Sequence, residues 1–177
     1  MPQSNAFKFA NNILTNGGYD AADLVGAAGG DSTPAFEAYL SGNQSVADNT
    51  AVKAEINTEL FDTNSCYDNA TNYRFTPTVA GKYFVYCTLE TDGGSGTNLN
   101  GAYVYIYKNG SSYMWSQADF YNNQIRAESI YISTTIDMNG TTDYLEVYGI
   151  VDSISGSGQI FKSGTKGTRF GAYRIIE

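Results

Sequence analysis

Alternating apolar and polar positions dominate most of the chain. The clearest example is Ala102–Lys108 (AYVYIYK), where tyrosines occupy one side of an extended strand and aliphatic residues occupy the other. Asn109 and Gly110 follow directly, and this pair supplies the positive φ angles of a two-residue hairpin turn. The partner strand is therefore expected from Ser111 to about Ala118.

Two further regions have strong strand character. Tyr83–Thr91 (YFVYCTLET) is a run of aromatic and β-branched residues that follows a turn at Gly81, which predicts a central strand buried on both faces. Ser129–Asp137 and Asp143–Asp152 flank a short connection with an Asn-Gly pair at positions 139 and 140. This arrangement predicts a second hairpin like the first.

The segment Thr50–Phe61 is ambiguous. Val52, Ala54 and Ile56 alternate as in a strand, whereas Val52, Ile56 and Leu60 recur every fourth residue as in a helix. Shorter strands are predicted at Ala35–Leu40, Gln159–Lys162 and Arg169–Ile176. Roughly eight to ten short strands without alternating helices favour an all-β sandwich or barrel.

The amino-acid composition changes near Pro34, and this change divides the chain into an N-terminal docking arm, 1–33, and a head domain, 34–177. The arm is rich in Asn, Gly, Ala and Asp, and its glycines leave pieces too short for stable isolated helices. Its apolar residues therefore need burial against another surface, which is either a partner protein or the chain's own head domain. The docking residues are predicted to be Phe7, Phe9, Ile13, Leu14, Tyr19 and Leu24.

Composition supports the all-β class and narrows the function. The 177 residues include 15 Tyr, 9 Phe and 19 Gly, and 42% of them are hydrophobic. A formal net charge of -8 opposes a nucleic-acid partner. No apolar run reaches the about 18 residues of a membrane span, and residues 1–5 (MPQSN) do not resemble a secretory signal. We therefore expect neither membrane insertion nor export.

The chemistry available to the chain is limited. There is no histidine, which removes Ser-His-Asp and Cys-His nucleophiles and imidazole metal sites. The acidic loops around Asp62, Asp92 and Asp137 carry oxygen ligands that calcium accepts, but solvated loops of this composition are more common than metal sites. The prediction is a non-enzyme with no catalytic, cofactor or metal site. Cys66 and Cys87 are expected as buried free thiols more than as a disulfide.

A more specific signature lies between residues 61 and 89. A Tyr-Asp-x-x-Thr turn is followed by a Phe strand, a Pro, and a Gly-x-Tyr that opens the most buried strand. This order resembles the globular head of the complement component one q and tumour-necrosis-factor-like superfamily. The matching residues are Tyr67, Asp68, Thr71, Phe75, Pro77, Gly81 and Tyr83. Later parts of the family pattern resemble Lys108–Gly110, Asp143–Val147 and Phe170–Ile176, so the resemblance covers Ala35–Glu177.

The resemblance implies a jelly roll of about ten antiparallel strands that associates as a homotrimer. An Asn-, Gly- and Ala-rich arm before such a head is also similar to structural proteins of tailed bacteriophages, especially marine ones. It implies a capsid decoration protein or head fibre, with the arm bound to capsid or tail proteins and the heads displayed outward. The expected location is the virion, assembled in the host cytoplasm.

Four aromatic residues on or after the return strand of the first hairpin form a candidate ligand surface or trimer interface: Tyr113, Trp115, Phe120 and Tyr121. Aromatic planes among Asn and Gln are typical of sugar-binding surfaces. The alternative function is therefore a receptor- or carbohydrate-binding tip of a tail fibre or spike that contacts a host surface glycan. A third reading, a secreted complement-type ligand, requires an export signal that residues 1–5 do not show.

Overall fold

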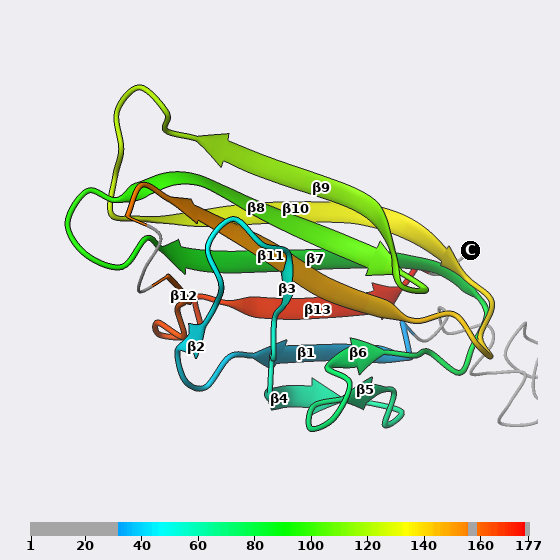
Figure 1. The fold of residues 1–177 in the computed structure, drawn as a ribbon. Helices are drawn as coiled ribbons and strands as arrows, with labels where there is room; N and C mark the ends of the chain where they lie inside the picture. The colour runs from blue at the N-terminus through cyan, green and yellow to red at the C-terminus, as the bar shows by residue number, and fades with distance from the viewer. Residues whose placement is uncertain (1–31, 156–158, 176–177) are drawn as a thin grey trace, which may run out of the picture. The chain divides into compact units, whose positions relative to one another are not determined.

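The computed structural model describes residues 32–155 and 159–175, which fold into two antiparallel β-sheets (Figure 1). These residues form thirteen strands and no helix, and therefore no helix that could span a membrane. The all-β jelly-roll prediction is confirmed. The predicted docking arm, 1–33, lies almost entirely outside the described residues, so its docking role stays a prediction.

Sheet A contains seven of the strands. They are β1 (Ala35–Tyr39), β2 (Gln44–Ser45), β4 (Thr58–Asp62), β7 (Gly81–Asp92), β10 (Ala127–Met138), β12 (Ile160–Phe161) and β13 (Arg169–Arg174). One edge of β7 pairs with β10 along its whole length, and the other edge pairs with β13 and β12. β13 pairs in turn with β1, and the other edge of β1 pairs with β4.

Sheet B contains six strands and lies in front of sheet A in Figure 1. They are β3 (Val52–Lys53), β5 (Tyr67–Asp68), β6 (Arg74–Phe75), β8 (Leu99–Lys108), β9 (Ser111–Asp119) and β11 (Leu145–Ser153). β11 pairs with β8 on one edge and with β6 and β3 on the other, and β9 pairs with β8. β9 and β10 are thus edge strands of different sheets, and they contact each other on the same side of the sandwich.

Aromatic residues of the sequence signature pack with Phe36 on β1 in the core between the sheets. The ring of Phe36 on β1 stacks on Tyr67 and on Phe75, with ring centroids 4.5 Å apart in both pairs. Phe170 on β13 meets Phe36 edge-on at 5.0 Å, and Tyr83 meets Phe75 at 5.7 Å. Because burial of aromatic area dominates core energetics, the signature residues locate the centre of the fold.

Several strand predictions are confirmed. The hairpin of β8 and β9 turns at Asn109 and Gly110, which have φ angles of 53° and 77°. The ambiguous segment Thr50–Phe61 contains β3 and the start of β4, so the helical alternative is wrong. Its inward residues, Ala54 and Ile56, are buried at the spacing of two expected for extended chain.

The second predicted hairpin is wrong. β10 pairs with β7 in sheet A, whereas β11 pairs with β8 in sheet B, so the connection 139–144 crosses between the sheets. The side chain of Asn139 organises this crossing, because its Oδ1 accepts hydrogen bonds from the backbone N–H groups of Thr141, Thr142 and Asp143. An Asn-Gly pair thus marks a turn without deciding whether the flanking strands pair.

β7 is central as predicted, but it is not buried on both faces. Its inward side chains are fully buried, while Phe84, Tyr86, Thr88 and Glu90 on the other face are only half-buried. No further layer of described residues covers this face of sheet A. The apolar content of β7 therefore leaves aromatic side chains on the surface of the sandwich.

Candidate functional site

Five aromatic rings lie together on the outer face of sheet B and form what we call the sheet B platform. It consists of Tyr103, Tyr105 and Tyr107 from β8, Trp115 from β9 and Tyr148 from β11. The alternation of β8 places its three tyrosines on the side opposite the buried aliphatic residues. The strand register then sets Trp115 and Tyr148 on either side of Tyr105.

The rings form a continuous surface. The rings of Tyr103 and Tyr105 are nearly parallel, with centroids 6.4 Å apart and an interplanar angle of 15°. The indole of Trp115 lies 6.4 Å from both of them, tilted by 41° and 33°. Tyr107 meets Tyr105 edge-on at 6.0 Å and stacks on Tyr148 at 4.2 Å. Aromatic contacts at these separations are attractive, and they hold the platform rings in place.

The platform is partly open to solvent, because its four tyrosines are half-buried and its tryptophan is exposed. The Trp115 side chain is 53% exposed, and Tyr113, two residues away at the β-bulge in β9, is 50% exposed. Within the described residues, the hydroxyls of Tyr103, Tyr105 and Tyr107 make no hydrogen bond. Burial, followed by the neighbouring phenols, raises the pKa of Tyr105, so this hydroxyl is protonated and can donate at neutral pH.

The cations beside the platform are already engaged. Lys53 Nζ lies 2.5 Å from the buried carboxylate of Glu146 and also donates to the carbonyl of Asn72 at 3.2 Å. Burial lowers the pKa of Lys53, but the hydrogen bond and charge of Glu146 outweigh it and raise that pKa overall. The guanidinium of Arg74 lies 4.7 Å from the ring centroid of Tyr144. Among these residues the charge of Lys53 is therefore paired with a carboxylate, and Arg74 lies over an aromatic ring.

A second aromatic surface, the sheet A face, occupies the outer side of sheet A. It consists of Phe61, Phe84, Tyr86, Tyr131 and Tyr173. Phe84 contacts Tyr173 at 5.5 Å and Tyr86 at 6.2 Å between ring centroids. Tyr131 and Tyr173 are 59% and 43% exposed, so this surface is also open to solvent in the single chain.

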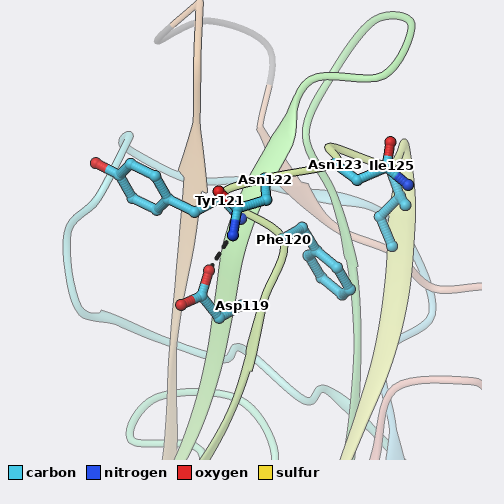
Figure 2. Close-up of a pocket in the computed structure, with 6 residues that line it drawn as sticks. All are labelled: Asp119, Phe120, Tyr121, Asn122, Asn123 and Ile125. Carbon is cyan, nitrogen blue, oxygen red and sulfur yellow. Dashed lines mark hydrogen bonds between the residues drawn. The ribbon is translucent and has the colours of Figure 1, made fainter.

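The loop between β9 and β10 forms a shallow depression at one end of the sandwich (Figure 2). Its lining residues are Asp119, Phe120, Tyr121, Asn122, Asn123 and Ile125. A carboxylate oxygen of Asp119 accepts a hydrogen bond of 2.9 Å from the backbone N–H of Tyr121. Figure 2 shows the Tyr121 ring directed away from Phe120. Phe120 packs against the core, whereas Tyr121 is 71% exposed.

The four aromatic residues predicted as a ligand or trimer surface lie in two separate places. Trp115 belongs to the sheet B platform with Tyr113 beside it, while Phe120 and Tyr121 belong to the separate loop depression. Sequence reasoning missed the tyrosines of β8 as partners of Trp115, although their strict alternation was a usable signal. Tyr148 lies on β11, and only the pairing of β11 with β8 brings it to the same face.

The acidic loops use their carboxylates within the fold. Asp68 accepts hydrogen bonds from the backbone N–H groups of Ala70, Thr71 and Asn72, and these bonds lower its pKa to about 2. Asp143 accepts from Asn109 and forms an ion pair with Lys108. In the part of the chain that the structure describes, no group of three or more His, Cys, Asp or Glu side chains is placed to hold a metal ion.

Both cysteines are buried free thiols, as the sequence favoured. Cys87 points into the core between the sheets, where burial raises the pKa of its thiol far above the ordinary value. A thiol held in this protonated state is a poor nucleophile. Cys87 is therefore a core residue and not part of a reactive site.

Comparison with known proteins gives a likeness of structure alone. No family model matches the sequence, and no curated protein matches it. The globular domain of the zebrafish complement 1qA protein superposes with a TM-score of 0.57 at 14% identity, covering 81% of this chain and 98% of that domain. Murine APRIL superposes with a TM-score of 0.53 at 10% identity, covering 80% and 98%. The chain thus has the jelly-roll fold shared by complement 1q globular domains and tumour-necrosis-factor-type proteins.

Proposed function

We propose that this chain is a non-enzymatic structural protein of a tailed-bacteriophage virion, a homotrimer displayed on the particle surface as a head fibre or capsid decoration. The observation that carries the assembly part of this proposal is the sheet A face, an aromatic surface without a covering layer among the described residues. Contiguous exposed apolar patches on soluble proteins mark interaction sites.

A cyclic trimer requires two different surfaces of each protomer to meet, because its contacts are heterologous. The sheet A face supplies one surface. The neighbouring side of the sandwich supplies the other, since β9 and β10 have unpaired outer edges there among the described strands. Met114 on β9 is exposed along this side. Association would bury both the aromatic patch and the open strand edges, which otherwise favour uncontrolled pairing.

The virion part of the proposal rests on the sequence of the arm and on its resemblance to phage structural proteins. Residues 1–33 carry Ile13, Leu14 and further apolar side chains that need a surface to bury them. Docking through a short arm leaves the heads free for display. No catalytic step is required of the chain, in keeping with its lack of histidine.

Light scattering during size-exclusion chromatography of the full chain tests the trimer. The expected mass is three times 19.2 kDa. Tyr173→Asp should yield a folded monomer, because it places a charge in the proposed interface. Tyr121→Asp, on the exposed loop, is the matched control and should remain trimeric. A monomeric full chain would refute the trimer, and a trimer unaffected by Tyr173→Asp would refute the sheet A face as its interface.

The docking arm needs a separate experiment. The full chain and its Ile13→Asp/Leu14→Asp variant are mixed with tailed-phage particles stripped of this protein, and binding is measured by co-sedimentation. The wild-type chain should sediment with the particles, whereas the variant should stay in solution as a trimer. Equal sedimentation of both proteins, or none of either, would overturn the proposed role of the arm.

A further inference from the structure

We infer that the sheet B platform is a binding face for a neutral oligosaccharide. This inference goes beyond the proposed function, because the proposed trimer uses the outer face of sheet A and the edges of β9 and β10, and gives no role to the outer face of sheet B. Of the four aromatic residues predicted as a ligand or trimer surface, it keeps Trp115 on β9, adds the tyrosines of β8 and β11, and leaves out the β9–β10 loop, where Tyr121 lies.

The ring geometry fits the flat apolar face of a sugar. The ring planes of Tyr103 and Tyr105 differ by only 15°. The ring of Trp115 lies beside both and is tilted by 41° to Tyr103 and by 33° to Tyr105. The C–H groups on one side of a pyranose ring carry a small positive charge, and they are attracted to the electron-rich faces of such rings. An extended oligosaccharide could therefore lie across β8 and β9.

The phenol hydroxyls supply the polar contacts that a sugar requires. Tyr103, Tyr105 and Tyr107 carry hydroxyls without a partner among the described residues, although their rings are partly buried. A sugar hydroxyl can both donate and accept a hydrogen bond. It can therefore accept one from a protonated phenol hydroxyl or donate one to the phenol oxygen. A purely apolar occupant would bury these hydroxyls without partners, at an unfavourable desolvation free energy.

Charge selects a neutral ligand over an anionic one. A sheet of exposed aromatic rings also suits unpaired nucleic-acid bases, but such proteins add a positively charged groove for the phosphates. Here Lys53 is paired with Glu146, Arg74 covers Tyr144, and the chain carries a net charge of -8. Phosphate, sulfate or sialic acid groups would therefore be repelled.

The protein carries its own probe, because Trp115 is the one tryptophan in the sequence and lies in the platform. The full chain is titrated with neutral linear hexasaccharides of glucose, mannose, galactose and xylose, and with sulfated and sialylated oligosaccharides of similar length. At least one neutral series should shift Trp115 emission saturably, and the charged series should bind at least ten-fold more weakly. A neutral panel that leaves the emission unchanged at millimolar concentration would overturn the inference.

Variants then locate the binding. Tyr105→Ala should weaken the neutral oligosaccharide at least ten-fold, and Tyr105→Phe, which keeps the ring and loses the hydroxyl, should weaken it two- to five-fold. Tyr121→Ala removes a more exposed aromatic outside the platform and should leave affinity unchanged. Loss of binding in Tyr121→Ala with retention in Tyr105→Ala would place the site in the loop and refute the platform.

Other occupants give distinct results. A blue-shifted Trp115 emission in the free chain that reverts on dilution would show a second copy on the platform. A blue shift that is lost in the Ile13→Asp/Leu14→Asp variant would show the chain's own N-terminal segment there. Either result overturns the inference. Light scattering on the same samples reports the oligomeric state independently, so failure of the trimer and failure of sugar binding are separable.

Discussion

The hydroxyl of Tyr86 on β7 donates a 2.6 Å hydrogen bond to Glu37 Oε2 on β1, two strands away in sheet A. Gly171 on β13 lies between them, because it is the register partner of both residues. The Tyr86 ring therefore crosses β13 at the one position in this row that has no side chain. This arrangement fixes the orientation of a central ring of the sheet A face.

Removal of this hydroxyl should weaken the fold measurably. Tyr86→Phe loses a hydrogen bond to a carboxylate and leaves Glu37 with Arg169, whose guanidinium is 3.6 Å away. Since both side chains are partly open to solvent, we expect a loss of about 1 kcal/mol in the free energy of unfolding, measured by urea denaturation. Tyr173→Phe, whose hydroxyl has no bond among the described residues, should change this free energy by less than about 0.5 kcal/mol.

Gly171→Ala should be more destabilising than Tyr86→Phe. A Cβ at this position would collide with the ring and hydroxyl of Tyr86, which must then leave its place above β13. The expected loss in unfolding free energy is about 1 to 3 kcal/mol. In a Tyr86→Ala background the same substitution should have little effect, because the colliding ring is absent. A loss of equal size in both backgrounds would contradict this account of Gly171.

Gly149→Ala should destabilise the core. This glycine lies on the inner face of β11, and an added Cβ would collide with Leu89 and Phe161 from sheet A. Because two packed sheets adjust little, we expect a loss of about 1 to 3 kcal/mol in the free energy of unfolding. Gly42→Ala is the control, since no atom lies within 4 Å of a Cβ there. Thermal unfolding followed by circular dichroism measures both variants.

Acid should weaken the fold in part through Asp68. Backbone hydrogen bonds lower the pKa of this carboxyl from 3.8 to about 2 in the folded chain, so folding favours its ionised form. The resulting stabilisation is fully present above pH 4 and is lost as the pH falls toward 2. In Asp68→Asn the slope of unfolding free energy against pH should be shallower across this window. Glu59→Gln, an exposed carboxylate on β4, serves as the charge-matched control.

The alternation of side chains was readable from the sequence because it depends on local geometry. A strand places successive residues on opposite faces, so AYVYIYK fixed which residues of β8 share a face, and the Asn-Gly pair fixed its turn and partner. The signature around Tyr67 and Phe75 likewise identified the jelly roll and located its aromatic core.

Pairing between distant strands was decided by the tertiary structure. The same Asn-Gly signal at 139–140 precedes a crossing between sheets, where β10 pairs with β7 along its whole length and β11 pairs with β8. The apolar run of β7 predicted burial on both faces, but Phe84 and Tyr86 are half-exposed. The sequence of a strand does not specify which other elements cover its faces. The sequence alone determined the periodicity of each strand. The sheet B platform exists only because long-range register brings Tyr105, Trp115 and Tyr148 from three strands to one face.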